Sequence, residues 1–239
     1  MTKPDPGAAL PPRAGADAAR PKPGAPDPGP PAGASDPGPP AGVPTTPRGR
    51  LRALIERNHG THRGWVRLQL AHFDHLVGRL APWTEVRLPR VKRVVFVCLG
   101  NINRSAFAHA VASRLGVQAA SFGLATTTGS HAFETATRIA QRFGISLDAH
   151  RATHLTDYEY REGDLLAAME VRHVNRLLDH GFAAQSIVLL GHWAAPMRLH
   201  IHDPHTLADS YFLTCFTILE SAVRNLAVEL RERGHPAAV

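Results

Sequence analysis

An apolar run, Val94–Val97, leads into eight residues of a different kind, Cys98–Ser105, and these lead into a helix-like stretch. The apolar run is typical of a buried strand. Gly100 and Asn101 permit tight backbone turning between the strand and the helix. A loop in this place can direct several backbone N–H groups at one point near a helix N-terminus. The segment therefore predicts a strand, a phosphate-binding loop and a helix in direct succession.

Three side chains of this loop suit covalent phosphate chemistry. The helix end and Arg104 are expected to favour the thiolate of Cys98, which is the reactive form of cysteine. The planar guanidinium of Arg104 can pair with two phosphate oxygens. Ser105 can donate a hydrogen bond to the sulfur and can also cap the helix. We predict a nucleophile and its phosphate clamp on one loop, and the alternative is a buried structural thiol.

Residues 1–48 differ in composition from the rest of the chain. Fifteen of the 20 prolines precede Arg48, and a near repeat joins residues 27–34 to residues 36–43. Almost no bulky apolar residue occurs there, so the segment cannot bury a core. We expect a disordered or polyproline-like tail, and a ligand for a proline-recognising domain is the alternative.

Residues 49–89 predict two short amphipathic helices that are broken near Gly60. Apolar residues recur at helical spacing on both sides of this glycine. They are Leu51, Leu54, Ile55, Trp65, Leu68, Phe73, Leu76, Val77 and Leu80. We expect the apolar faces to pack on the following domain. Arginines decorate both helices, so contact with a membrane surface or with a second copy of the chain is the alternative.

Charge and cysteine usage narrow the class of protein. The net charge is +7, but residues 91–239 hold 14 basic and 13 acidic side chains. We therefore expect no nucleic-acid partner, because such proteins have a basic face on the folded domain. The two cysteines, Cys98 and Cys215, fit a reducing cytoplasm. The sequence shows neither the apolar segment of a signal peptide nor an apolar run of about 18 residues, so we expect a cytoplasmic protein without a membrane span.

From Val91 onward strand-like and helix-like segments alternate. Strands are predicted at 91–97, 117–122, 165–169 and 186–190, and helices at 104–115, 133–143, 171–180 and 206–232. The alternation predicts an α/β fold for residues 90–239, with a four-stranded parallel sheet and helices on both faces. Ligands of such sheets bind at the carboxyl ends of the strands, which is where Cys98 lies.

The loop resembles the signature of the low-molecular-weight protein tyrosine phosphatases, which usually read Cys-x-Gly-Asn-x-Cys-Arg-Ser. The resemblance extends over approximately Val91–Leu230. Asp164–Met169 resembles the third strand of the family, and Ile201–Pro204 resembles its acid loop. It implies the family's fold and a phosphocysteine intermediate on Cys98, with Arg104 binding the phosphate.

The resemblance also implies roles outside the loop. Asp203 is expected to protonate the departing phenolate and then to activate water as a base. The pKa of Asp203 must rise for this role, and a bound dianion with partial burial would raise it. Ser121 and His150 are expected to support the loop. The remaining loop residues are expected to contact substrate: Leu99, Gly100, Asn101, Ile102, Asn103 and Ser105.

Two other interpretations of the acid segment stay open. Asp209 is the rival general acid. A histidine and carboxylate pattern can also converge on a metal ion. The residues of that pattern are His200, His202, Asp203 and His205. The phosphatase mechanism needs no metal, and we expect neither a metal nor a cofactor.

Some positions depart from the family pattern. Asn103 replaces the second loop cysteine, which forms a protective disulfide with the nucleophile in many relatives. His205 and Thr206 replace the aromatic pair after Asp-Pro, and residues 124–129 lack the usual aromatic wall. Ile102 stands where relatives that act on phosphoarginine tend to have threonine, and this favours phosphotyrosine.

Three functions remain in competition. The favoured one is a protein tyrosine phosphatase that acts on a phosphotyrosine-containing protein, such as a bacterial-type tyrosine kinase, or on small aryl phosphates. A thioredoxin-coupled arsenate reductase requires two further cysteines for a disulfide relay, and only Cys215 is present. A non-catalytic phosphate-binding scaffold fits the altered aromatic walls, whereas the intact Cys98, Arg104 and Asp203 favour an enzyme.

Overall fold

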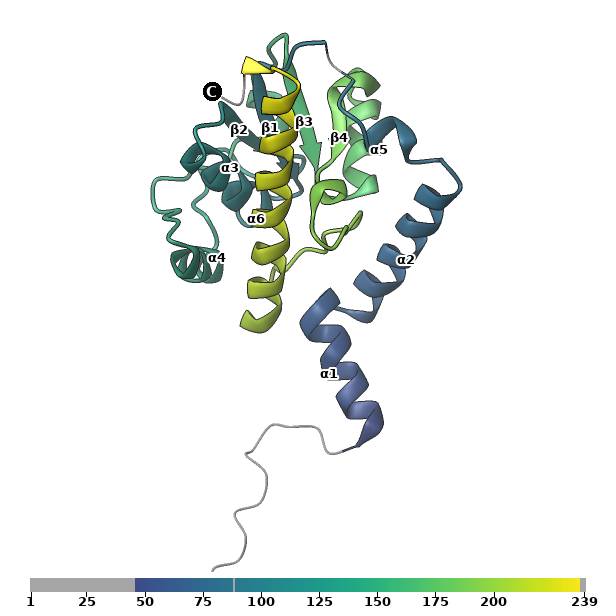
Figure 1. The fold of residues 1–239 in the computed structure, drawn as a ribbon. Coiled ribbons are helices and arrows are strands. Elements are labelled where there is room, and N and C mark those ends of the chain that lie inside the picture. The colour runs from purple at the N-terminus through teal and green to yellow at the C-terminus, as the bar shows by residue number, and fades with distance from the viewer. Residues whose placement is uncertain (1–45, 88, 237–239) are drawn as a thin grey trace, which may run out of the picture. The chain divides into compact units, whose positions relative to one another are not determined.

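A four-stranded parallel sheet forms the centre of the computed structural model, which describes residues 46–87 and 89–236 (Figure 1). The strand order is β2-β1-β3-β4. The strands are β1 (Arg93–Cys98), β2 (Ala119–Gly123), β3 (Asp164–Ala168) and β4 (Ile187–Leu189). The predicted fold class is confirmed, and every strand lies within two residues of its predicted range.

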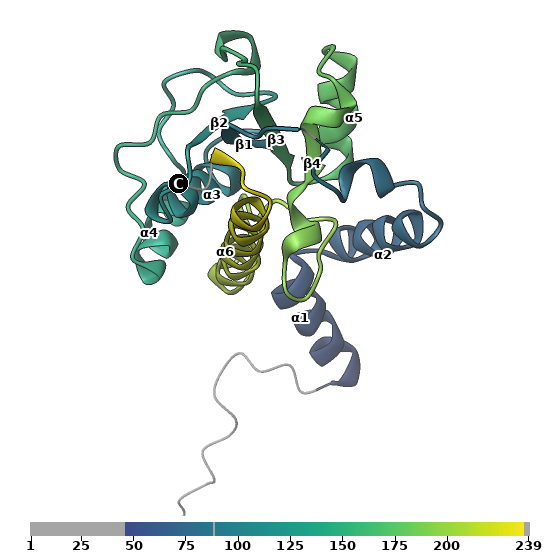
Figure 2. The same cartoon turned by 45° about the horizontal axis from the view of Figure 1, so that its top comes forward.

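Helices cover both faces of the sheet (Figure 2). They are α3 (Arg104–Arg114), α4 (Glu134–Ala140), α5 (Val171–Asp179) and α6 (Asp209–Glu232). Short 3₁₀ helices occur at Ala81–Trp83, Gln141–Phe143, Leu155–Asp157, Ala184–Ser186 and Leu190–Trp193. The long predicted helix begins at Asp209 instead of 206, and the other predicted helices are present at their places.

The side chains of β1 divide the core into two layers. Val94 and Phe96 pack with α3, α4 and α6 on one face, because alternate residues of a strand point to the same side. Val95 and Val97 pack with α5 on the other face. Both faces are buried, as parallel sheets require, and this explains the unbroken apolar run in the sequence. The double burial fixes the strand whose carboxyl end carries Cys98.

Two helices precede the sheet, as predicted. They are α1 (Pro47–His59) and α2 (His62–Leu76). The hydroxyl groups of Thr46 and Thr61 accept hydrogen bonds from the first turns of α1 and α2, respectively. Gly60, with φ of 75°, ends α1 in a conformation that favours glycine. The predicted break near Gly60 is therefore confirmed.

Only part of the apolar surface of these helices is covered. Leu68 and Ala71 of α2 are buried, and Ala71 joins the core layer beside α5. No residue of α1 is buried. Large apolar side chains are also exposed on the two helices and directly after α2, namely Leu51, Leu54, Trp65, Val66, Leu70, Phe73, Leu76 and Val77. Packing on the domain is thus found for α2, and a membrane or dimer contact stays a prediction for the exposed face.

The predicted tail lies outside the described residues, apart from residues 46–48. The predicted domain boundaries at 48 and 89 stay predictions. Across residues 46–87 and 89–236, no helix has the length and apolar character needed to cross a membrane.

Candidate active site

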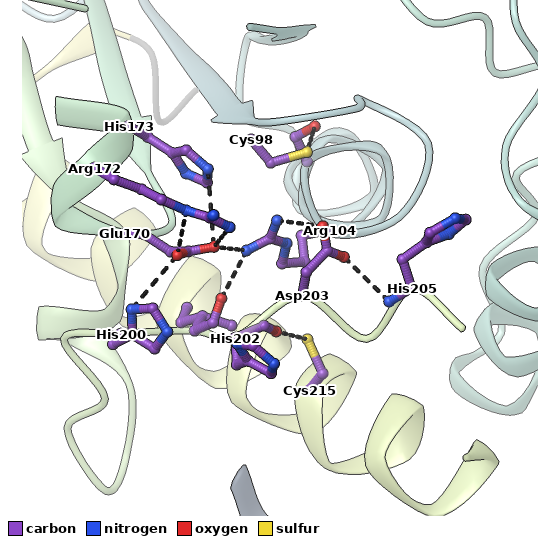
Figure 3. A network of polar contacts seen from close by, with 12 residues as sticks. Cys98, Arg104, Glu170, Arg172, His173, His200, His202, Asp203, His205 and Cys215 are labelled. Carbon is purple, nitrogen blue, oxygen red and sulfur yellow. Dashed lines mark hydrogen bonds and ion pairs between the residues drawn. The ribbon is translucent and has the colours of Figure 1, made fainter. Parts of the chain in front are cut away.

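The loop between β1 and α3 surrounds the Cys98 sulfur. Cys98 ends β1, and its side chain is buried (Figure 3). The Sγ atom lies 3.0 Å from Ser105 Oγ and accepts a hydrogen bond from the backbone N–H of Asn101 at 3.3 Å. Asn101 has φ of 50°, a conformation that asparagine tolerates better than most residues. The predicted contact between Ser105 and the nucleophile candidate is present.

Asn101 holds the loop through both ends of its side-chain amide. Its Nδ2 donates to Ser105 Oγ at 2.8 Å and to Ser121 Oγ at 2.9 Å. Its Oδ1 accepts from the backbone N–H of Thr153 at 2.9 Å. The Nε2 of His150 lies 2.7 Å from the Asn101 carbonyl oxygen. Ser121 and His150 therefore both contact Asn101, and their supporting role stays a prediction.

A glycine at the end of β2 allows the loop to lie close to the sheet. A Cβ on Gly123 would lie 2.9 Å from the carbonyl oxygen of Leu99 and 3.1 Å from Cβ of Asn101. Any other residue would push the loop outward. Sequence reasoning had not singled out this position, although a glycine at the carboxyl end of the strand beside β1 was an available signal.

Arg104 is fully buried and held by three acceptors. Its Nη1 donates to Glu170 Oε1 at 2.5 Å and to the Ile201 carbonyl at 2.8 Å, and its Nη2 donates to Asp203 Oδ2 at 2.7 Å (Figure 3). Burial acts to lower the pKa of Arg104, but Asp203 and Glu170 outweigh it and raise the pKa. The Nε–H has no acceptor within the described residues. Since a guanidinium has five N–H donors, Nε–H and one Nη2–H remain for a ligand.

Glu170 is a site residue that sequence reasoning missed. It lies just beyond the carboxyl end of β3 and is fully buried. Arg172 approaches its Oε2 at 2.7 Å, and His200 lies 3.5 Å from the same oxygen. Burial acts to raise the pKa of Glu170, but Arg104 and the nearby histidines hold it well below its ordinary value. The available signal was a charged residue directly after an apolar strand that neighbours β1.

Asp203 is the carboxylate that faces the loop. Its Oδ1 accepts from the backbone N–H of His205 at 3.2 Å, and its Oδ2 pairs with Arg104. Burial acts to raise the pKa of Asp203, but Arg104 and the His205 N–H outweigh it, so the pKa lies below its ordinary value. The rival Asp209 forms an exposed ion pair with Arg138 at 2.7 Å and does not line the pocket. Asp203, the candidate general acid, is therefore ionised when no ligand is bound.

The residues of the metal interpretation do not converge. His200 lies beside Glu170, His202 lies 3.1 Å from Thr61 Oγ1, and Asp203 binds Arg104. In the part of the chain that the structure describes, no group of three or more His, Cys, Asp or Glu side chains is placed to hold a metal ion.

A pocket of about 180 Å³ opens above the sulfur. Its lining is Cys98, Leu99, Gly100, Ile102, Asn103, Ala125, Asp203 and His205. Among the described residues, the backbone N–H groups of Gly100, Ile102 and Asn103 donate to no protein acceptor. The ring of His205 packs edge-on against Phe133 at 4.7 Å between centroids. An imidazole supported by a phenyl ring therefore stands where the sequence predicted a missing aromatic wall.

Buried histidines make the fold sensitive to acid. Burial is the main cause that lowers the pKa of His173 to about 3 and the pKa values of His109 and His200 to about 4. Between about pH 6.5 and pH 4 the unfolded chain therefore binds protons that the folded chain does not, so acid lowers the free energy of unfolding. We expect the urea midpoint to be lower at about pH 5 than at about pH 7.5.

Replacing His173 by Asn removes one of the buried histidines with a lowered pKa. The urea midpoint of this variant should therefore fall less than that of the wild type between about pH 7.5 and pH 5. The low pKa values of Glu170 and Asp203 act with the same sign at lower pH, because their stabilisation is lost as the carboxylates are protonated. A midpoint that stays constant or rises on acidification would contradict the neutral state of the buried histidines.

Comparison with known proteins places this arrangement in one family. The family model described as low molecular weight phosphotyrosine protein phosphatase matches residues 93–235. The low molecular weight protein-tyrosine-phosphatase Wzb of Salmonella typhi is 32% identical over 148 residues, which are 60% of this chain and 98% of the relative.

Solved structures agree with this match. The tyrosine phosphatase AmsI of Erwinia amylovora superposes with a TM-score of 0.54 at 30% identity, over 58% of this chain and 93% of that one. The YwlE arginine phosphatase of Geobacillus stearothermophilus superposes with a TM-score of 0.52 at 25% identity, over 59% of this chain and 94% of that one. The helices α1 and α2 precede the matched residues. From residue 93 to residue 235, the chain belongs to the low molecular weight phosphotyrosine protein phosphatase family.

Proposed function

We propose that the chain is a protein tyrosine phosphatase that works through a phosphocysteine on Cys98. The observation that carries this proposal is a pocket lined by Cys98 and Asp203, with the buried guanidinium of Arg104 bound to the Asp203 carboxylate and its Nε–H left without an acceptor among the described residues. Such a site supplies a nucleophile, charge stabilisation and an acid, which are the three requirements of phosphomonoester hydrolysis.

In the first step the Cys98 thiolate attacks phosphorus, the S–P bond forms and the P–O bond to the phenol breaks. Asp203 gives its proton to the departing oxygen. In the second step a water attacks the phosphocysteine, and the ionised Asp203 takes the proton of that water. The S–P bond breaks, and phosphate leaves with the thiolate restored.

Asp203 must gain a proton before the first step, although Arg104 keeps it ionised in the free site. An incoming phosphate dianion competes with Asp203 for the Nη2 of Arg104. It also brings negative charge next to the carboxylate. Both effects raise the pKa of Asp203, so substrate binding itself prepares the acid.

The pocket favours an aryl phosphate. Cys98 lines the pocket and is only 2% exposed, so a substrate must enter the pocket to bring its phosphate to the sulfur. Leu99, Ile102 and Ala125 supply apolar walls for a phenyl ring, and His205 closes the lining. These walls support phosphotyrosine as the substrate.

The protein substrate is predicted only as a class. A bacterial-type tyrosine kinase and a cytoplasmic location stay predictions of this proposal. The arsenate-reductase alternative lacks support, because the described Cys98 and Cys215 are both free and no third cysteine occurs in the sequence. The scaffold alternative becomes one outcome of the test that follows.

Replacing Asp203 by Asn is expected to lower kcat/KM on phenyl phosphate by about 10²-fold, because the phenolate must then leave without a proton. The comparison uses kcat/KM because kcat also includes hydrolysis of the phosphocysteine, in which Asp203 is the base for both esters. The fall should be much smaller on p-nitrophenyl phosphate, whose leaving group is far less basic. Steady-state kinetics of both substrates at one pH measure the difference between the two falls.

Asp209→Asn is the matched control, since it removes a carboxylate of the same segment that lies outside the pocket. It should change neither rate more than about twofold. A wild-type protein that binds phosphate without hydrolysing either ester would favour the scaffold. Turnover of phosphoarginine but not of phosphotyrosine would contradict the substrate class.

A further inference from the structure

The turn between α1 and α2 contacts the acid loop, Ile201–Pro204. Thr61 Oγ1 lies 3.1 Å from Nε2 of His202, the residue directly before Asp203. The same oxygen accepts the backbone N–H of Gly64 at 2.9 Å. Burial is the main cause that lowers the pKa of His202, so its ring is neutral and can form this bond with either partner as the donor.

Two glycines bring the turn against the histidine ring. A Cβ on Gly60 would lie 2.8 Å from Cδ2 of His202 and 2.7 Å from Cε1 of Tyr211. A Cβ on Gly64 would lie 2.8 Å from Cγ of His202. Neither position has room for a side chain, since a Cβ on Gly64 would also meet the carbonyl oxygen of His59. The backbone of the turn is therefore in direct contact with the His202 ring.

His202 lies between the two residues of the acid loop that bind Arg104. The carbonyl of Ile201 accepts from Nη1 of Arg104, and the carboxylate of Asp203 accepts from Nη2. The carbonyl of His202 accepts from Tyr211 Oη at 3.2 Å. Fixing the ring of His202 therefore restricts the backbone that aims Asp203 at the pocket.

This contact comes from residues outside the family match. The match begins at residue 93, and 60% of this chain covers 98% of the Salmonella Wzb relative. The helices α1 and α2 are thus an addition that touches the acid loop of the shared domain. A second contact joins His59 Nδ1 to Nη1 of Arg198 at 2.9 Å, just before that loop.

We propose that Thr61 is a positioning residue for the general acid. Its hydroxyl, together with the close packing at Gly60 and Gly64, holds His202 and thereby sets where the Asp203 carboxyl meets the leaving oxygen. The inference rests on the proposed function, since it gives α1 and α2 a part in the step that Asp203 performs. It predicts that a change in the turn lowers acid catalysis and spares nucleophilic attack.

The test uses Thr61→Gly in the full chain. Glycine is nearly as good an N-cap as threonine, so this variant keeps α2 and removes the hydroxyl that meets His202. We expect kcat/KM on phenyl phosphate to fall by about fivefold, the effect of one hydrogen bond. On p-nitrophenyl phosphate kcat/KM should stay within about twofold, because that leaving group needs little protonation and kcat/KM excludes the second step.

Two variants separate positioning from capping. Thr46→Gly removes the equivalent cap hydroxyl of α1, which has no contact with the acid loop, and should leave both rates unchanged. Thr61→Ser restores a hydroxyl at the same place and should recover the rate on phenyl phosphate. Circular dichroism verifies that every variant keeps its helices.

The outcomes distinguish the two proposals. A wild-type protein that hydrolyses neither ester overturns the proposed function. If Asp203→Asn shows the leaving-group difference and Thr61→Gly does not, only the positioning role fails. The positioning role also fails if Thr61→Gly slows both esters equally, if Thr46→Gly has the same effect, or if Thr61→Ser does not restore the rate.

Discussion

Replacing Cys98 by Ser is expected to lower kcat on p-nitrophenyl phosphate by at least about 10⁴-fold. A serine hydroxyl is not ionised at neutral pH, and neither Ser105 nor Asn101 beside it is a base that can remove its proton. The loop should keep its shape, because oxygen is smaller than sulfur and accepts the same hydrogen bonds. Steady-state kinetics give the loss, and binding of inorganic phosphate by calorimetry verifies that the pocket remains.

Cys215→Ser is the control for this variant. Cys215 is fully buried in α6, and burial raises the pKa of its thiol, so it cannot supply a thiolate. Its Sγ lies 3.9 Å from the His202 carbonyl oxygen, a weak contact whose loss should have little effect. We expect activity within a few-fold of wild type. A Cys98→Ser protein with substantial turnover, or a wild-type reaction that on acid quench yields no phosphocysteine, would contradict the mechanism.

Replacing Arg104 by Lys is expected to lower kcat/KM by about 10³-fold, although the positive charge is kept. A lysine ammonium has three donors on one nitrogen and cannot reach Glu170, Ile201 and Asp203 while it also grips a phosphate. The buried Glu170 is left with fewer partners, so the free energy of unfolding should also decrease. Kinetics and urea denaturation measure the two losses separately.

Arg93→Lys is the matched control, because Arg93 also binds a buried carboxylate, Asp164, at 2.7 Å. That pair joins the first residues of β1 and β3, at the end of the sheet opposite the pocket. The variant should lose stability and keep its activity per folded molecule. If both lysine variants lowered activity alike, the loss at Arg104 would reflect the fold and not phosphate binding.

The local part of the site could be predicted from the sequence. The run Val94–Val97 identified β1, because a doubly buried strand has an unbroken apolar pattern. The turn residues and Arg104 then followed within the next seven positions. Chain continuity alone placed Ser105 near Cys98, and the structure shows the contact. Such features depend on neighbours in the chain, which a sequence displays directly.

Partners far apart in the sequence could not be predicted in the same way. Glu170 lies 66 positions from Arg104, and His202 lies 141 positions from Thr61. Periodicity reports which face of an element is buried but not which element covers it. The packing of Phe133 beneath His205 was missed for the same reason. The acid loop was located by family resemblance, whereas its neighbours needed the fold.

Because Arg104 pairs with two carboxylates, the binding of a phosphate in the pocket depends on pH. Arg104 and Arg172 together balance the ionised Glu170 and Asp203, so this cluster has no spare positive charge to offset an incoming dianion. A phosphate dianion therefore binds tightly only when the site takes up a proton with it. Loss of that proton weakens the binding of the inorganic phosphate product. We therefore expect product inhibition of this protein to be weaker at alkaline pH.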